Sequence, residues 1–255
     1  MSEPLVTFNQ LSVSFAAEQG RVRAVQEVSF AIKAGQTIGV VGESGCGKSV
    51  TAMSLMGLLP PQAARIDGGE IRFQGEDLLR LKPSKMADLR GNQLAMIFQE
   101  PMTALNPVLT IGEQLCEPLI RHRGLSPKAA WQRATQLIAE VGLARAESLM
   151  SSYPHQLSGG MLQRIMIAMA LSCQPKLLIA DEPTTALDVT VQAQILRLLG
   201  DQAQAYPMAL MLITQDQGVI VQMAEHVVVM YAGRLVEQGL TADVLRHPQS
   251  GRAHE

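Results

Sequence analysis

The sequence has little cysteine and no long apolar run, and each absence excludes a class of protein. The three cysteines, Cys46, Cys116 and Cys173, lie far apart in the 255 residues and form no Cys-x-x-Cys pair, which argues against a zinc site and against a disulfide framework. The longest apolar stretches, such as 165–171 and 207–213, are much shorter than the roughly 18–20 residues that a bilayer-spanning helix needs. A membrane-spanning chain is therefore not expected.

The sequence also has no excess of positive charge. Lys and Arg total 21 against 23 Asp and Glu, so the global basic field with which proteins hold a nucleic-acid backbone is missing. We therefore expect no nucleic-acid partner. The start, Met1-Ser2-Glu3-Pro4, has no basic segment followed by an apolar one, so no secretory signal is predicted and the chain is expected to stay in the cytosol.

Apolar patterning indicates a sheet in the first hundred residues and helices after it. The strands predicted there are 11–15, 28–32, 37–41, 70–73 and 94–98. From about 102 to 156 helical spacing takes over, and one helix is predicted to begin at Ser126, with Pro127 at its first position, and to close at Gly142. Further along, the predicted elements are helices at 159–173 and 190–199, strands at 176–180 and 208–214, and a hairpin over 227–236 that turns at Ala232-Gly233. Strands that alternate with helices imply a parallel sheet, here interrupted by an all-helical insert.

Eight consecutive residues fit the phosphate-loop pattern G-x-x-x-x-G-K-[ST]. They are Gly42, Glu43, Ser44, Gly45, Cys46, Gly47, Lys48 and Ser49. A predicted strand precedes them and a predicted helix, 50–58, follows, which is the context that this motif requires. The glycines let backbone N–H groups converge on the phosphates of a nucleotide at a helix N-terminus. Lys48 would supply a positive charge to the outer phosphates, and Ser49 a hydroxyl ligand for Mg²⁺.

A second candidate lies at the end of the apolar run 177–180, where Asp181 and Glu182 follow each other. Because successive strand residues point to opposite faces, the two carboxylates could do different work. Asp181 would hold Mg²⁺ through water, and Glu182 would act as the general base on an attacking water molecule. Two acids after a strand could also simply begin a loop, but the phosphate loop upstream favours the catalytic interpretation.

The segment Leu157-Ser158-Gly159-Gly160-Met161-Leu162-Gln163-Arg164 resembles the signature of the ATP-binding cassette (ABC) family. Ser158 would cap a helix, and the N–H groups of Gly159 and Gly160 would form a second anion cradle. Taken alone, Ser158 could be a helix cap and nothing more. The resemblance implies that two cassettes pack head to tail, so that each signature completes the nucleotide site begun by the other chain's phosphate loop. Met161 replaces the usual glutamine, as in the variant common in peptide and nickel importer cassettes.

Other landmarks of the family follow in the expected order, so the resemblance covers residues 5–240. Gln99 matches the glutamine that senses Mg²⁺ and the γ-phosphate of ATP. Phe15 matches the aromatic that stacks on adenine, although an aromatic at a strand end is as often a core residue. Ala186-Leu187-Asp188 matches the loop that crosses the dimer seam. Segments 100–107 and 153–156 resemble the peptide/nickel importer group, in which the helical insert docks on a membrane permease.

The sequence departs from the family at two places. Gln215 stands where the family has its switch histidine, and a glutamine offers an amide donor but cannot carry a proton. Natural degeneration and a substitution that slows hydrolysis both fit. The chain also ends soon after His247-Pro248, where members of the group usually continue, so no iron–sulfur site or substrate-gating domain is predicted.

The fold that the resemblance implies is α/β, a P-loop NTPase parallel-sheet core with an antiparallel β subdomain and an all-helical insert. The predicted domains are a nucleotide-binding core of 1–100 and 157–240, a permease-docking insert of 101–156, and a short tail of 241–255. The implied function is ATP binding and hydrolysis that powers import of small peptides, nickel or a related solute. Catalysis would involve Glu182, Gln99 and Gln215, and Mg²⁺ would be held by Ser49, Gln99 and Asp181.

The resemblance also implies partners and a location. The partners would be a second ABC ATPase subunit, as homo- or heterodimer, integral membrane permease subunits and, indirectly, a solute-binding protein, with the chain peripheral on the cytoplasmic face of the inner membrane. Gln215 favours an alternative, a hydrolytically weak regulatory cassette paired with an active one, which the intact Lys48, Gln99 and Glu182 oppose. A cassette that acts on ribosomes or DNA would predict tandem cassettes or a long coiled-coil insertion, and the sequence has neither.

Overall fold

The chain folds into two compact units in a computed structural model that describes residues 3–18, 20–185 and 187–246. The first unit comprises Met1–Ala87 and Pro207–Glu255, and the second comprises Asp88–Tyr206. The second unit is therefore one continuous insertion between the two segments of the first. None of the described helices is both long and apolar enough to cross a lipid bilayer.

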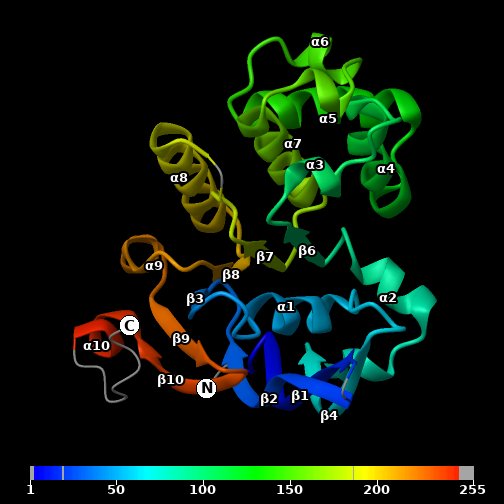
Figure 1. Cartoon of the computed structure of the whole chain (residues 1–255). Helices are drawn as coiled ribbons and strands as arrows, with labels where there is room; N and C mark the ends of the chain where they lie inside the picture. Colours follow the sequence, from blue (N-terminus) through cyan, green and yellow to red (C-terminus); the bar gives the residue numbers. More distant parts are fainter. Residues whose placement is uncertain (1–2, 19, 186, 247–255) are drawn as a thin grey trace. The chain divides into compact units, whose positions relative to one another are not determined.

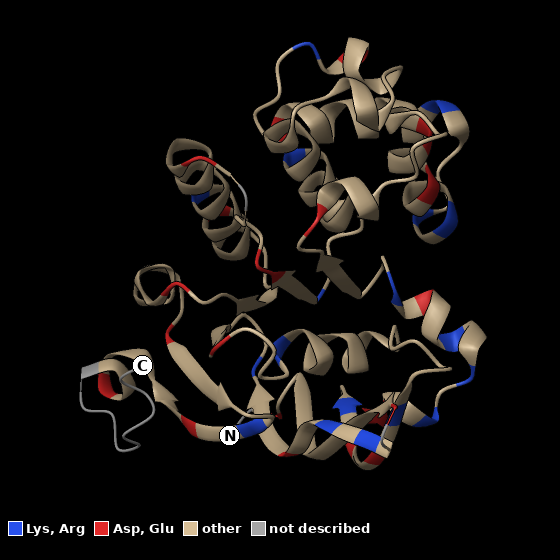
Figure 2. Cartoon of the chain, in the orientation of Figure 1, with Lys and Arg blue, Asp and Glu red and all other residues tan. Residues whose placement is uncertain are grey.

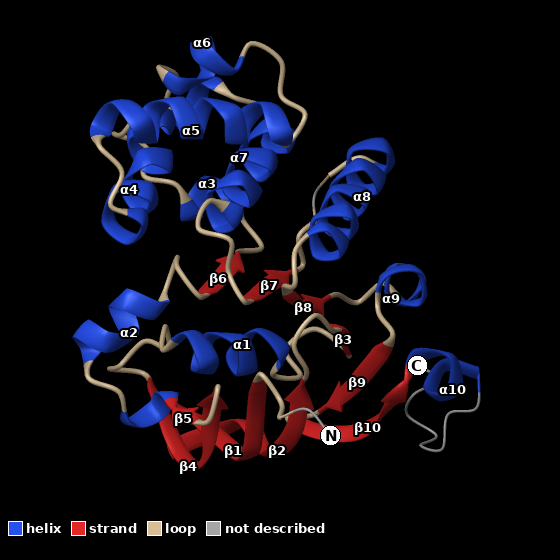
Figure 3. Ribbon diagram, turned by 180° about the vertical axis from the view of Figure 1, so that it is seen from behind, coloured by secondary structure: helices blue, strands red, loops and turns tan. Residues whose placement is uncertain are grey.

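The first unit contains a four-stranded antiparallel sheet (Figure 3). Its strands lie in the order β2 (Gly20–Ile32), β1 (Val6–Ala17), β4 (Ala64–Phe73) and β5 (Glu76–Asp77). Along β1 the apolar residues Phe8, Leu11 and Val13 are buried, and Phe8 stacks on Phe30 of β2 with ring centroids 4.4 Å apart. One face of this sheet therefore belongs to the core, as the alternation of apolar and polar residues in such strands requires.

A second group of strands in the first unit carries the phosphate loop (Figure 1). It contains β10 (Arg234–Leu240), β9 (His226–Tyr231), β3 (Thr37–Val41) and β8 (Ala209–Ile213). β3 pairs in parallel with both β8 and β9, while β9 and β10 form an antiparallel hairpin whose Ala232-Gly233 turn was predicted. The helical elements of this unit are α1 (Lys48–Met56), η1 (Leu78–Arg80), α9 (Gln217–Met223) and α10 (Thr241–Arg246). β8 is buried along its whole length, as expected of a parallel strand covered on both faces.

The second unit combines two parallel strands with a group of helices. β6 (Leu94–Ile97) pairs with β7 (Leu177–Asp181). The helical elements are α3 (Pro101–Ala104), α4 (Ile111–Arg123), α5 (Pro127–Glu140), α6 (Ala146–Met150), η2 (Pro154–Gln156), α7 (Gly159–Leu171) and α8 (Val189–Ala205). α2 (Pro83–Leu89) spans the point where the chain passes from one unit to the other. Between 101 and 156, a stretch described throughout, the chain forms helices and loops and no strand.

Helix α5 shows how closely local sequence sets an element. It begins after Ser126, whose hydroxyl accepts a hydrogen bond from the Ala129 N–H at 3.3 Å, with Pro127 at the first helical position. It ends just before Gly142, which has a φ of 77°, and the buried Ala130 and Ala134 share its inner face. The predicted boundaries of this helix are confirmed.

The parallel strands with helices, beside a separate antiparallel sheet, confirm the predicted α/β fold class. The partition into a nucleotide-binding core, a permease-docking insert and a tail stays a prediction about function. The compact units are a different partition, with boundaries at 87/88 and 206/207.

Candidate functional site

The phosphate loop joins β3 to α1 in the first unit, as predicted. The N-cap of α1 is Gly47, with a φ of 103° and no side-chain cap. A helix N-terminus without a capping side chain leaves backbone N–H groups available to an anion, and the helix dipole favours negative charge there. The loop therefore has the backbone arrangement that a phosphate group requires.

Two glycines of the loop are required by close packing as well as by backbone conformation. A Cβ atom added at Gly42 would lie 2.1 Å from the Met230 carbonyl oxygen, and one added at Gly47 would lie 2.5 Å from the Ala24 carbonyl oxygen. Gly45, in contrast, faces open space, with nothing within 4 Å of an added Cβ. The loop is thus anchored on β2 and β9 and keeps an open middle, which fits a cradle for phosphates.

Lys48 lies folded over this loop. Its side chain is buried, and its Nζ donates to the carbonyl oxygens of Gly42 at 2.7 Å and Glu43 at 2.8 Å. The Cys46 Sγ is 3.9 Å from the same Nζ. Burial raises the pKa of the Cys46 thiol, and the positive charge of Lys48 opposes that shift only in part. Ser49 follows as a half-buried residue in the first turn of α1.

Phe15 lies on β1 and pairs directly with Val22 of β2. Directly paired residues of an antiparallel sheet point to the same face. Phe15 is half-buried and Val22 is 60% exposed, so the two form an apolar surface that could receive a flat ring. Sequence reasoning missed Val22, because the register that sets it opposite Phe15 depends on a hairpin whose pairing contains irregularities.

Gln215 lies beyond the carboxyl end of β8, two residues after Ile213, which is opposite Val40 in the parallel pair with β3. The Thr214 N–H donates to the Val40 carbonyl oxygen at 3.3 Å. Gln215 and the phosphate loop therefore leave the carboxyl ends of neighbouring parallel strands, the edge at which open α/β sheets bind ligands. Gln215 is exposed at this edge.

The two acids belong to the second unit. Asp181 is the last residue of β7 and is 4% exposed. Glu182 follows the strand with a φ of 45°, a left-handed conformation that is unusual for a residue with a side chain. The expectation that both acids lie on the strand is wrong for Glu182: a backbone turn, and not strand alternation, separates the two carboxylates.

Gln99 lies beside Glu182. The sequence alone did not predict this contact. β6 and β7 run parallel with Ile97 opposite Ala180, so both residues leave the same edge of the pair. Gln99 Nε2 donates to Glu182 Oε2 at 3.0 Å, and Thr185 Oγ1 donates to the same oxygen at 2.9 Å. Two donors thus orient one carboxylate oxygen of the candidate general base. Thr185 belongs to this site through that contact, although none of the sequence motifs pointed to it.

The signature segment forms the start of α7 in the same unit. Ser158 is the N-cap, and its hydroxyl accepts a hydrogen bond from the Met161 N–H at 3.4 Å, as predicted. Ser158 and Gly159 are exposed, and a Cβ added at Gly159 would meet nothing within 4 Å. The N-terminus of α7 is therefore accessible to solvent. Of the predicted seam-crossing loop 186–188, Ala186 lies outside the described residues.

The start of α7 is joined to the segment that follows the acids. Gln163 is 2% exposed, and its Nε2 donates to the carbonyl oxygen of Pro183 at 2.7 Å. Pro183 comes directly after Glu182. Asp188, which caps α8 by accepting from the N–H groups of Thr190 and Val191, begins the next helix. The second unit thus brings together Asp181, Glu182, Gln99 and a helix start with an accessible N-terminus.

Comparison with known proteins agrees with these motifs. The family described as ABC transporter matches residues 25–185. The dipeptide transport ATP-binding protein DppD of Bacillus subtilis (strain 168) is 51% identical over 247 residues, which cover 97% of this chain and 74% of that protein. The oligopeptide transport ATP-binding protein OppD of Salmonella typhimurium is 50% identical over 244 residues, which cover 96% of this chain and 72% of that protein.

A solved structure agrees as well. The dimeric post-hydrolysis state of the ATP-binding cassette MJ0796, bound to ADP and Pi, has a TM-score of 0.83 to this chain at 26% identity, and the match covers 92% of this chain and 98% of that one. The family match spans well over half of the sequence and includes the phosphate loop and both acids. The chain therefore belongs to the ABC transporter family, as one of its ATP-binding and ATP-hydrolysing subunits.

Proposed function

We propose that the chain powers the import of small peptides through a partner membrane permease. The substrate class rests on the relatives. The Bacillus subtilis and Salmonella typhimurium proteins are named for dipeptide and oligopeptide transport, and about half of the residues of this chain, compared over nearly the whole length of this chain, are identical to each. Nickel transport and a regulatory cassette with little turnover, the alternatives that the sequence left open, gain no support from these relatives.

In the proposed site, residues 42–49 bind the phosphates of ATP. Lys48 would exchange the carbonyl oxygens of Gly42 and Glu43 for phosphate oxygens, because an ionised acceptor makes a stronger hydrogen bond than a neutral one. Phe15 and Val22 would offer an apolar surface to the adenine ring. The uncapped N-terminus of α1 supports this assignment.

Ser49, Gln99 and Asp181 would hold Mg²⁺, since a hydroxyl, an amide oxygen and a carboxylate are oxygen ligands of the kind that this hard cation prefers. When bound, the ion would neutralise charge on the phosphates. Glu182 would act as general base on the attacking water. The main support for ATP hydrolysis at this site is the 3.0 Å hydrogen bond from Gln99 to Glu182, because it holds the half-buried carboxylate of Glu182 in one orientation.

The proposed assembly contains two cassettes and a permease. Ser158, Gly159 and Gly160 would complete the nucleotide site of the second cassette, and the dimeric state of MJ0796 supports such pairing. The helical stretch 101–156 would dock on the permease, and the exposed apolar side chains of Met102 and Val108 support a contact there. The chain would then be peripheral at the cytoplasmic face of the membrane, with a solute-binding protein as an indirect partner.

The variant Glu182→Gln tests the hydrolytic assignment. Removal of a general base typically lowers the rate by ~10²–10⁴, so turnover in the assembled transporter should fall by that factor while ATP binding persists. Glu100→Gln, a neighbouring exposed acid of the same unit, is the matched control and should leave turnover unchanged. Full turnover by Glu182→Gln would mean that another group activates the water.

A further inference from the structure

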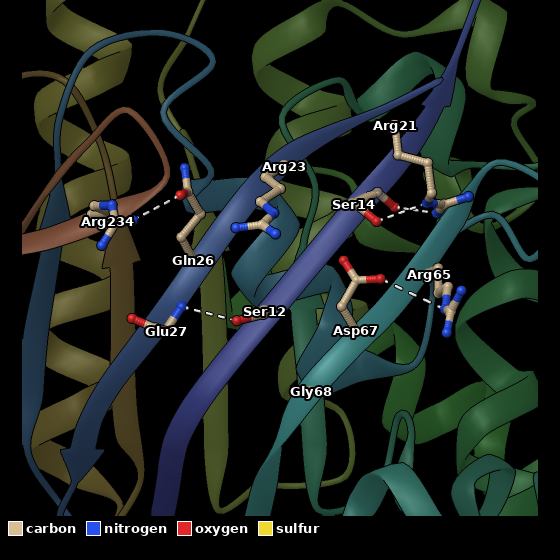
Figure 4. A pocket seen from close by; sticks show the side chains of 10 residues that line it. All are labelled: Ser12, Ser14, Arg21, Arg23, Gln26, Glu27, Arg65, Asp67, Gly68 and Arg234. Carbon is tan, nitrogen blue, oxygen red and sulfur yellow. Dashed lines mark hydrogen bonds and ion pairs between the residues drawn. The ribbon is translucent and has the colours of Figure 1, made fainter. Parts of the chain in front are cut away.

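A basic pocket of about 570 Å³ opens on the antiparallel sheet of the first unit (Figure 4). Four arginines line it, Arg21, Arg23, Arg65 and Arg234, together with the carboxylates of Glu27 and Asp67. Figure 2 marks the basic positions of these strands in blue. The whole chain has a formal net charge of −2, so this local excess of arginine contrasts with the rest of the molecule.

The pocket lies on the sheet face opposite the candidate adenine surface. Ser14, which lines the pocket, directly precedes Phe15 on β1, and Arg21 and Arg23 flank Val22 on β2. Successive strand residues point to opposite faces of a sheet. The pocket is therefore separate from the face that Phe15 and Val22 present, and the nucleotide site does not account for it.

Three of the four guanidinium groups have a polar partner on these strands. Arg21 donates to the Ser14 hydroxyl and to the Ser14 carbonyl oxygen, both at 2.8 Å. Arg234 donates to Gln26 at 3.0 Å, and Arg65 pairs with Asp67 at 3.6 Å. Ser14 is 2% exposed, so the partner of Arg21 is buried.

Arg23 differs from these three. Its backbone belongs to β2, but within the described part of the chain its guanidinium forms no hydrogen bond or ion pair, and the side chain lies between Gln26 and Asp67 (Figure 4). A guanidinium without a partner is a fork with free donors for an incoming anion, and Arg21, two residues away on the same strand, is already oriented by two hydrogen bonds.

We propose that this pocket binds a small phosphate-bearing anion, held by Arg23 and Arg21. Guanidinium groups match phosphate oxygens in paired, charge-assisted hydrogen bonds. Four arginines against two carboxylates leave a surplus of two positive charges, close to the charge of about −1.5 to −2 that a phosphate monoester carries at pH 7. The pocket volume falls in the range of small-molecule sites.

The test uses inorganic pyrophosphate as the probe. Because the phosphate loop also binds such anions, the titration is made by calorimetry on the Lys48→Ala variant, with that loop disabled. In this background Arg23→Gln should weaken binding about tenfold, since hydrogen bonds to charged groups are worth more than neutral ones. Arg23→Lys keeps the positive charge but loses the paired donors of the guanidinium, so its pyrophosphate affinity should lie between those of the parent and of Arg23→Gln. Arg72→Gln is the control, because Arg72 is exposed on the same strand as Arg65 but outside the pocket.

Arg23→Gln removes no side-chain hydrogen bond or ion pair of the described residues, so it should fold normally, and equal thermal unfolding would verify that. The site would be overturned if Arg23→Gln bound pyrophosphate as tightly as its parent. It would also be overturned if Arg72→Gln lost as much pyrophosphate affinity as Arg23→Gln. Citrate that binds as tightly as pyrophosphate would overturn the phosphate assignment.

The phosphate could belong to a soluble anion or to a lipid headgroup. A second arm therefore measures cosedimentation with phosphatidylglycerol vesicles, with phosphatidylcholine vesicles as control. Arg23-dependent binding to the anionic vesicles, without pyrophosphate binding, would assign the same chemistry to a lipid headgroup. We expect pyrophosphate to bind, because the residues line a concave pocket.

Discussion

Glu182 occupies a backbone conformation that its own side chain disfavours. A left-handed φ costs a residue with a Cβ about 1–2 kcal/mol, and Glu182 has a φ of 45°. Hydrogen bonds from Gln99 and Thr185 hold its carboxylate at this turn. Such strain gathers at sites where the surrounding structure fixes a functional group, in agreement with the proposed role as general base.

At the same scale, Gln215 is expected to limit the rate at this chain's own nucleotide site. Gln215→His should raise turnover, by up to ~10²–10⁴ if proton handling is what glutamine lacks. Single-turnover ATP hydrolysis in the assembled transporter measures this effect. Gln217→His, two residues along at the start of α9, is the control and should change nothing. If Gln215→His leaves the rate of ATP hydrolysis unchanged while Glu182→Gln abolishes it, then glutamine at position 215 already supports full turnover.

At the scale of elements, Gln163 joins α7 to the segment after β7. Gln163→Leu would leave the buried Pro183 carbonyl oxygen without its donor, at a cost of about 1–3 kcal/mol in the free energy of unfolding. We also expect slower ATP hydrolysis, because Pro183 directly follows Glu182. Urea unfolding and steady-state turnover measure the two effects. Gln132→Leu, exposed on α5, should stay within about 0.5 kcal/mol of wild type.

The N-terminus of α4 should make part of the stability depend on pH. Hydrogen bonds from the Thr110 backbone N–H, and then from its hydroxyl, lower the pKa of Glu113 in a capping box. A lowered pKa in the folded state stabilises the fold above the ordinary pKa of the group, and this contribution is lost as the pH falls through the folded value. Glu113→Gln should therefore destabilise the chain at neutral pH and less so in acid.

Urea unfolding of wild type and Glu113→Gln at pH 7 and at about pH 3, below the ordinary glutamate range, measures this dependence. Glu117→Gln, an exposed acid on the same helix but outside the capping box, is the control. A stability difference for Glu113→Gln that stays constant with pH would contradict the capping role.

At the scale of the whole molecule, the signature is expected to serve a neighbouring cassette. Ser158→Arg would fill the anion cradle at the start of α7, and so should block the nucleotide site of the partner while ATP binding to this chain's own loop is unchanged. Titration of ATP to the isolated chain and turnover of the assembled pair separate the two effects. Ser151→Arg, exposed in the same unit, is the control. Normal turnover of the assembly with Ser158→Arg would rule out the shared site.

The sequence by itself determined the elements whose signals are local. The phosphate loop between a strand and a helix, the start of α5 at Ser126 and the cap of α7 at Ser158 all agree with the structure. Each depends on sterics and hydrogen bonds within a few consecutive residues, which short motifs encode. The family, too, could be identified from such motifs.

Only the tertiary structure decided which distant residues meet. Gln99 and Glu182 are 83 residues apart and touch because β6 and β7 pair in one register. Val22 lies opposite Phe15 because of a hairpin register that includes irregularities, and the arginine pocket collects residues from four strands, β1, β2, β4 and β10. A shift of one residue in any of these pairings would turn the side chains to the other face. Register is set by packing of the whole unit, which is why local patterns did not predict these contacts.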